Sequence, residues 1–383
     1  VIASNAITGT LNDYQVNKIH WMTSLDSNLL MGTESGIWVV RSANAEGLAP
    51  DNVQARRQHA TASADAQAVL ISDALMFLNR AQRKLYSLRL DNGLDHYTAN
   101  DETLLADHML YMGADRFAYQ ESPHRLLWVL RRDGSLATLT YDSSNAFKGW
   151  SKHQIGGSFQ NGPAVVESIA SIPKPSADGA GAVDDLWLVV KRQALGTTIR
   201  YIEHLESYWD YGQDLDQAVF VDASASYDGL PVGQVGGLEH LYAQEVTGLA
   251  DGLVIAPAIV DDGPLSLPQA SAKVHVGLAY PCEGAILDID KGGNDGSAMG
   301  KPRQIFEALF KVWRSWSLKS GHSWDALREL DFGAETPTEF SGDLRLKRDE
   351  GGWARSTQLV WRQDQPYPLT LLSLGLRIKV EGG

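Results

Sequence analysis

The sequence has a single cysteine, Cys282, and no long apolar run. One cysteine cannot form a disulfide within the chain, so no disulfide framework holds the fold, which suits assembly in a reducing cytoplasm. No apolar stretch reaches the roughly 18 residues that a membrane-spanning helix needs. The N-terminus has no basic region followed by an apolar one, so we expect no secretory signal peptide. We therefore expect no membrane insertion by this chain.

Basic residues are scarce relative to acidic ones. The chain has 33 Lys and Arg against 47 Asp and Glu, a formal net charge of -14. A protein that grips nucleic acid through its phosphates needs a surplus of Lys and Arg, so this balance argues against tight DNA binding. A like-charged wall would repel the DNA backbone and let DNA slide past.

Catalytic and metal-binding signatures are also missing. The chain has no G-x-S-x-G nucleophile elbow, no His-x-x-x-His pair and no cysteine cluster. Its ten histidines are scattered, and adjacent carboxylates such as Asp184–Asp185 and Asp261–Asp262 are typical of solvated turns in an acidic protein. We predict that the protein is not an enzyme, with no catalytic, cofactor-binding or metal-binding residue and no cofactor.

Two overlapping stretches come close to ligand-binding motifs. Gly292–Lys301 approaches a phosphate-binding loop, but Asp295 replaces its first glycine and Pro302 replaces its Ser or Thr. A mobile hairpin loop is the favoured interpretation. Asp288, Asp290 and Asn294 suggest a calcium loop, yet position 292, where the pattern needs an oxygen ligand, is a glycine. A solvated turn is favoured there, and a bound cation stays open.

A third stretch resembles a box found in sialidase-like propellers. Ser317–Trp324 matches the Ser-x-Asp-x-Gly-x-x-Trp pattern except at Lys319, which stands where the pattern has Asp. The stretch also lies outside the repeated region described next, so we interpret the match as coincidence.

The first half of the chain repeats one unit, in which an apolar strand, a polar turn and a second apolar strand follow one another. Four copies begin roughly 45 to 60 residues apart, near the blade spacing of β-propellers. They are Leu29–Val40, Leu75–Leu88, Leu126–Leu139 and Leu186–Ile202. A blade cannot bury its faces alone, so blades stack around an axis. The repeats predict β-propeller blades over residues 1–206, with Trp38, Trp128 and Trp187 largely buried between them.

The remaining segments are more varied. Residues 103–112 have apolar spacing that favours a helix, and residues 173–185 are typical of an exposed loop. Residues 207–237 suggest a linker or a long loop excursion, because they are acidic and rich in Gly and Asp. Residues 238–383 predict a β-barrel or sandwich domain, in which residues 303–316 form either a helix or a strand pair. The expected fold class is therefore all-β.

Five passages resemble the tail nozzle (tail tubular protein B-like) family of short-tailed bacteriophages. They are short and structural, but they keep their order over nearly the whole chain. The passages are Ile19–Met22 with Leu30–Val40, Leu75–Tyr86, Gln120–Gly134 with Leu139–Asp142, Val219–Ala223 with Tyr227–Gly229, and Gly237–Leu241 through Ala250–Gly252 to Val276–Tyr280. The family carries more chain before the first blade, and this chain starts at Val1 rather than Met, so we expect a fragment or a processed product.

The resemblance implies a β-propeller joined to a barrel-rich platform. It implies six copies in a ring, attached below the portal and adaptor proteins, through which DNA leaves the virion without being held tightly. The protein would be assembled in the cytoplasm of the bacterial host and would reside in the virion tail. Two alternatives from other classes stay open: a propeller scaffold that binds the host surface, and a propeller enzyme that degrades glycans.

Overall fold

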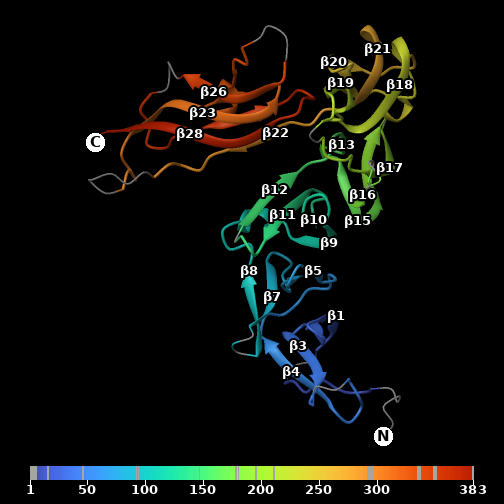
Figure 1. Cartoon of the computed structure of the whole chain (residues 1–383), viewed down its shortest axis with the longest axis vertical. Coiled ribbons are helices and arrows are strands. Elements are labelled where there is room, and N and C mark those ends of the chain that lie inside the picture. Colours follow the sequence, from blue (N-terminus) through green and yellow to red (C-terminus); the bar gives the residue numbers. More distant parts are fainter. Residues whose placement is uncertain are drawn as a thin grey trace. The chain divides into compact units, whose positions relative to one another are not determined.

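The computed structural model describes residues 7–381 apart from 15–16, 45–46, 92, 94, 146, 177–178, 180, 195, 210–211, 291–296, 334–337 and 348–351. The described residues form an all-β protein with only short 3-10 turns as helical elements (Figure 1). Contacts divide the chain into two compact units, residues 1–193 with 197–207, and residues 194–196 with 208–383.

The first unit begins with three antiparallel meanders of four strands each, in which every strand pairs with the next one along the chain. The first contains β1 (Ile19–Leu25), β2 (Asn28–Thr33), β3 (Ile37–Ser42) and β4 (Val53–His59). The second contains β5 (Val69–Ile71), β6 (Ala74–Leu78), β7 (Leu85–Asp91) and β8 (His96–Asp101). The third contains β9 (Ala114–Gln120), β10 (Leu126–Arg131), β11 (Leu136–Asp142) and β12 (Phe147–His153).

A three-stranded sheet follows, with β16 between its two neighbours. Its strands are β15 (Val165–Pro175), β16 (Ala182–Ala194) and β17 (Thr197–His204), preceded by the short pair β13 (Ser158–Phe159) and β14 (Gly162–Pro163). All four predicted hairpins are therefore present as β2–β3, β6–β7, β10–β11 and β16–β17. In the three meanders they are the two central strands.

Successive sheets of this unit share apolar clusters, because the central strands are buried on both faces. Leu75 and Phe77 of β6 pack with Leu30 and Ile37 of the first sheet. The alternate residues of β6, such as Met76, pack instead with the third sheet. The same alternation on β10 sends its residues to the second and fourth sheets in turn. A strand covered on both faces has no polar side, which explains the continuous apolar runs of the repeats.

The turn between β10 and β11 shows why glycine is needed there. Gly134 has φ of 79° and donates its backbone N–H to the carbonyl of Arg131 at 3.0 Å. A Cβ at this position would lie 2.5 Å from Cγ1 of Val165. Backbone conformation and close approach to β15 therefore both favour glycine.

Of the three tryptophans predicted to be buried between blades, Trp38 and Trp128 are buried. Trp128 lies in the cluster shared by the third and fourth sheets. Trp38 is also buried, but it follows Ile37 on β3, so alternation points it away from the cluster that Ile37 joins. Trp187 is only partly buried and packs against His204, with ring centroids 5.1 Å apart. Trp187 does not lie between two sheets as Trp128 does, because its neighbours Leu186 and Leu188 take the face of β16 that joins the shared cluster.

The second unit contains three more sheets. The first has the order β18-β21-β19-β20, from β18 (Asp222–Val235), β19 (Glu245–Ala250), β20 (Leu253–Ile259) and β21 (Leu265–Leu278). The second has the order β22-β27-β24-β25, from β22 (Cys282–Ala285), β24 (Lys319–Gly321), β25 (Arg328–Glu329) and β27 (Val360–Gln363). The third has the order β26-β23-β28, from β23 (Arg303–Ser315), β26 (Phe340–Lys347) and β28 (Thr370–Val380).

Side chains from both halves of this unit meet in one cluster that includes Leu249, Trp316 and Tyr367. Each of the three sheets is open over the described residues, so the barrel alternative is not seen among them.

Three segments form strands that differ from expectation. Residues 207–237, expected as a linker or loop, contain the 14-residue strand β18 and the turn η2 (Leu215–Gln217). Strands β15 and β16 extend through most of residues 173–185. Residues 303–316 are neither a helix nor a strand pair but a single long strand, β23. In all three segments, pairing with a long neighbouring strand supplies a ladder of hydrogen bonds. Local composition does not reveal that pairing, because these stretches are polar or ambiguous by themselves.

The helix expected over residues 103–112 is instead a series of turns with one 3-10 turn, η1 (Asp107–Met109). Asp101 Oδ1 accepts hydrogen bonds from the backbone N of Thr103 at 2.8 Å and from its hydroxyl at 2.5 Å. This local bonding replaces the first turn of a helix, as short polar side chains commonly do.

Candidate functional site

In the second unit, side chains of the motif-like stretches make hydrogen bonds and ion pairs within the protein. Asp290 accepts hydrogen bonds from the Ser297 hydroxyl at 2.8 Å and from the backbone N of Ala298 at 2.9 Å. Asp288 forms an ion pair with Arg303 at 3.1 Å. Asn294 and Asp295 lie outside the described residues. Among the residues that are described, no group of three or more His, Cys, Asp or Glu is placed to hold a metal ion.

The stretch that resembles the sialidase box, Ser317–Trp324, also has a side chain engaged in a structural contact. Lys319, the residue that departs from the pattern, forms an ion pair with Asp364 at 2.7 Å on the sheet that contains β24 and β27. Its position outside the four hairpins agrees with interpreting the match as coincidence.

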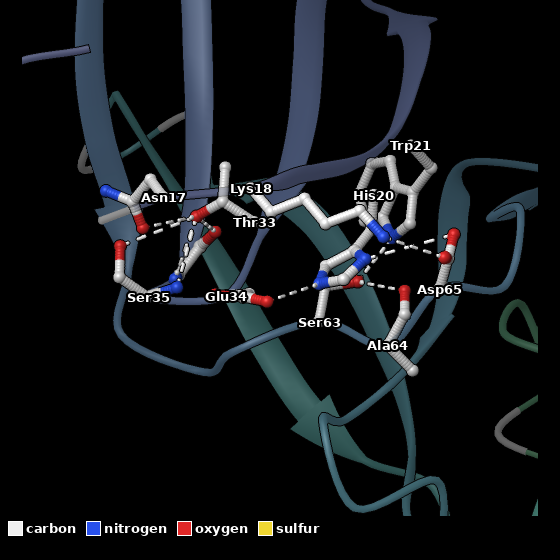
Figure 2. Close-up of polar contacts among 11 residues, drawn as sticks. Asn17, Lys18, His20, Trp21, Thr33, Glu34, Ser35, Ser63, Ala64 and Asp65 are labelled. Carbon is white, nitrogen blue, oxygen red and sulfur yellow. Dashed lines mark hydrogen bonds and ion pairs between the residues drawn. The ribbon is translucent and has the colours of Figure 1, made fainter. Parts of the chain in front are cut away.

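A network of polar side chains connects the first sheet to the chain that enters the second (Figure 2). His20 of β1 lies between two carboxylates, with Nε2 3.9 Å from Glu34 and Nδ1 3.9 Å from Asp65. Lys18 forms an ion pair with Asp65 at 3.1 Å, and this contact lowers the pKa of the Asp65 carboxyl. The indole N–H of Trp21 donates to the hydroxyl of Ser63.

The same network resembles a catalytic group of Ser, His and carboxylates, but its hydrogen bonds do not form one. The Ser63 hydroxyl accepts from Trp21 and lies 3.2 Å from the carbonyl of Ala64, to which it donates. No hydrogen bond joins it to His20 among the contacts of the described residues. A nucleophile needs its proton directed at a base, so this serine is not arranged for nucleophilic catalysis. The network fastens two sheets together.

A different surface stands out by its exposure. The connection between β8 and β9 carries four large apolar side chains that face solvent, and we call residues 104–112 the apolar loop. Leu104 is 71% exposed, Leu105 97%, Tyr111 61% and Met112 51%. Leu110, in the middle, is fully buried in the cluster shared by the second and third sheets. The loop is therefore anchored by Leu110, with Met109 packed against the same cluster, while its four other large apolar side chains face outward.

Hydrogen bonds and an ion pair hold the apolar loop in place. The backbone N of Ala106 donates to Thr103, that of Met109 to Ala106, and that of Gly113 to Leu110, each at 2.9 Å. The ammonium of Lys84 pairs with Asp101 at 3.2 Å and with Asp107 at 2.9 Å. The exposure of the apolar side chains therefore coexists with an ordered backbone.

The apolar loop borders a surface hollow of about 610 Å³, which Arg131 and Lys152 also line. The Arg131 side chain is buried, donates to the Ser135 hydroxyl at 2.6 Å and pairs with Asp133 at 3.2 Å. Lys152 is exposed. Asp107 and His108 line the hollow as well, so exposed apolar side chains stand beside both acidic and basic groups. An open surface of this mixed kind is suited to contact with another protein.

Sequence reasoning missed this surface because the apolar spacing of residues 104–112 is also that of a helix with a buried side. At 100° per residue, Leu104, Leu105, Tyr111 and Met112 fall on one face of such a helix, so the spacing alone carries no signal that they are exposed.

Comparison with known proteins adds no identity. No model of a protein family matches the chain, and no curated protein matches it. Across the described residues, no helix has the length and apolar character needed to cross a membrane.

Proposed function

We propose that this chain is a structural component of a bacteriophage tail, a nozzle-like ring subunit that forms part of the DNA-ejection channel. One observation supports the proposal most. Four small antiparallel sheets follow one another along the chain and pack face to face, and three of the resembling passages lie on strands of the first three sheets.

Within this proposal, the stacked meanders are blades of a β-propeller, and the second unit is the platform domain. Sequential four-stranded meanders that share apolar clusters are the arrangement that propeller blades require. The proposed partners are further copies of the chain, a hexamer by the family resemblance, together with the portal, the adaptor and other tail proteins. DNA passes through the ring without tight binding, in keeping with the acidic composition.

The test is electron microscopy of phage particles that contain the chain. We expect density for several copies in a closed ring around the channel axis of the tail. A reconstruction that places the protein as a single copy, or as an appendage away from the channel, would overturn the proposal.

A propeller scaffold that binds the host surface is the second candidate. The apolar loop favours it, because exposed apolar patches commonly mark interaction sites. Replacing Leu104 and Leu105 with serine distinguishes the two: a host-binding scaffold would lose adsorption to bacteria with its tail assembly intact.

No observation of the structure specifically favours a glycan-degrading enzyme. The prediction that the protein has no hydrolase activity is checked by incubating it with host lipopolysaccharide and capsule and detecting new reducing ends. Turnover that one Asp or Glu substitution abolishes would contradict it.

A further inference from the structure

The negative charge of the chain is concentrated in one segment. Residues 201–300 contain 16 of the 47 acidic residues but only two of the 33 basic ones, Lys273 and Lys291. This segment alone accounts for the net charge of -14, and the rest of the chain is balanced. The second unit therefore combines a strongly acidic region with the less acidic sheet β26-β23-β28 that follows it.

That sheet carries a basic face. Strand pairing places Glu307 opposite Arg377, Leu309 opposite Arg345 and Gly375, and Gln304 opposite Lys379. Because side chains alternate along a strand, four cations share the face that bears Glu307 and Trp313. They are Lys311, Arg345, Arg377 and Lys379, and we call this surface the basic face. Phe310, Val312 and Leu344 point to the opposite side, into a buried cluster.

The basic face is open to solvent. The side chains of Arg345 and Arg377 are 51% and 64% exposed, although both hold the buried carboxylate of Glu307 at 2.9 and 3.0 Å. Lys311 and Lys379 are exposed, and so is Trp313. Trp and Arg are the residue types that contribute most to protein–protein interfaces.

The acidic region presents exposed carboxylates at the end of its sheet where β19 begins and β20 ends, and these carboxylates complement the basic face in charge. The backbone N of Ala243 donates to the carbonyl of Val260 at 2.9 Å, which brings Glu245 close to Asp261 and Asp262. All three carboxylates are exposed, and none of them pairs with a basic side chain among the described residues. Asp262 and Asp261 raise the pKa of Tyr242, as a local excess of negative charge does. Ile259, beside them, is exposed and apolar.

We propose that the basic face of one copy binds this acidic end of a second copy, with Trp313 against the apolar surface around Ile259. Both surfaces are exposed within one chain, so they do not neutralise each other there. The contact joins two different surfaces, which makes it head-to-tail, as a ring requires. In this respect the inference rests on the proposed function.

A protein partner fits the basic face better than nucleic acid. Two of its four cations already share Glu307, and Asp343 is paired opposite Lys311. The remaining surplus is small for a surface that must neutralise many phosphates, and the acidic region would repel a polyanion.

The experiment measures self-association of the full chain by analytical ultracentrifugation at low and high salt. Two charge reversals are compared, K311E/K379E on the basic face and E245K/D262K at the acidic end. We expect the unmodified chain to associate at low salt and to dissociate as salt screens the contact. Each reversal should weaken association about tenfold or more.

Mixing the two reversed proteins is the decisive step. Each reversed surface then meets a surface of opposite charge on the other variant, so association should return in the mixture. The matched control is R80E/R125E, which changes the net charge as K311E/K379E does but at two exposed arginines of the first unit, and it should leave association unchanged. Thermal unfolding of every variant shows that it is folded.

Several results would overturn the inference. These are a chain that stays monomeric at low salt, reversals without effect, or a mixture that does not recover. Binding of a duplex oligonucleotide that only K311E/K379E abolishes would assign the basic face to nucleic acid instead. A tail ring whose subunit contacts lie elsewhere would contradict the inference and leave the proposed function standing.

Discussion

The imidazole of His153, at the end of β12, is held uncharged inside the third sheet. Its Nε2 lies 2.9 Å from the Thr138 hydroxyl and 3.1 Å from the Ser151 hydroxyl, and its ring packs on Trp128. Burial lowers the pKa of His153 to about 4. The unfolded chain binds this proton near pH 6.5. Folding is therefore favoured above that pH, and the benefit is lost as the pH falls toward 4.

We expect the free energy of unfolding to contain a His153 contribution about 2 kcal/mol smaller at pH 5 than at pH 7.5. Urea denaturation at the two pH values measures the change. The control is His153→Gln, which keeps hydrogen-bonding capacity but cannot titrate, so its pH dependence should be flatter. An identical pH dependence in both proteins would show that His153 is not buried in its neutral form.

Glu102 is a buried carboxylate between the second and third sheets. It accepts a hydrogen bond from the Ser87 hydroxyl and forms an ion pair with Lys148 of β12 at 2.5 Å. The Lys148 side chain is 45% exposed, but its removal leaves the buried Glu102 carboxylate without its cation, so Lys148→Ala should cost about 2 kcal/mol. The control is Asp73→Ala, which breaks the exposed 3.5 Å pair with Arg89 and should cost about 1 kcal/mol or less. Denaturant unfolding would contradict this account if the two losses were equal.

At the scale of the element, the apolar loop divides its leucines between two roles. Leu110→Ala should lower the free energy of unfolding by about 2–5 kcal/mol, because it opens a cavity in the cluster between two sheets. Leu105→Ala removes the same atoms from a side chain in solvent and should change stability by about 0.5 kcal/mol or less. Urea denaturation of the two variants is the measurement. Similar losses would mean that Leu105 packs against the protein.

At the scale of the whole molecule, the distribution of charge determines how tightly we expect the protein to bind DNA. Five arginines of the first unit could form a basic stripe: Arg41, Arg56, Arg57, Arg131 and Arg132. Three of them lie near carboxylates, because Arg41 pairs with Asp95 at 3.1 Å, Arg57 lies 3.8 Å from Asp13, and Arg131 pairs with Asp133. We therefore expect only weak binding of duplex DNA at about 150 mM salt, where few phosphates would be neutralised. Fluorescence polarisation with a labelled duplex is the assay. A tight complex whose affinity falls steeply with added salt would contradict the prediction.

Much of the first unit was predictable from sequence. Strands that are covered on both faces must be apolar throughout, as in Leu75–Leu78 and Leu126–Leu130, and the turns between them are short and polar. Such hairpins form from contacts between residues near one another in the chain, so local pattern is enough to find them. The all-β class followed from the same pattern.

The second unit was less predictable for a physical reason. Strand β18 pairs with β21, roughly 40 residues away, and β23 lies between β26 and β28, which come later in the chain. Their residues are stabilised by partners that are distant in sequence, so composition near Asp222 or Arg303 says little about the strand that forms there.

The features used for the functional proposals also divide into those that the sequence determined and those that only the tertiary structure decided. Sequence alone determined the hairpins, the acidic total and the lack of familiar catalytic motifs, because each is a property of neighbouring residues or of a sum. Only the tertiary structure decided that Leu110 is buried while Leu105 is exposed, and that Lys311, Arg345 and Arg377 share one face. Exposure and shared faces depend on which distant strand covers or adjoins a residue, and that is decided when the sheets pack.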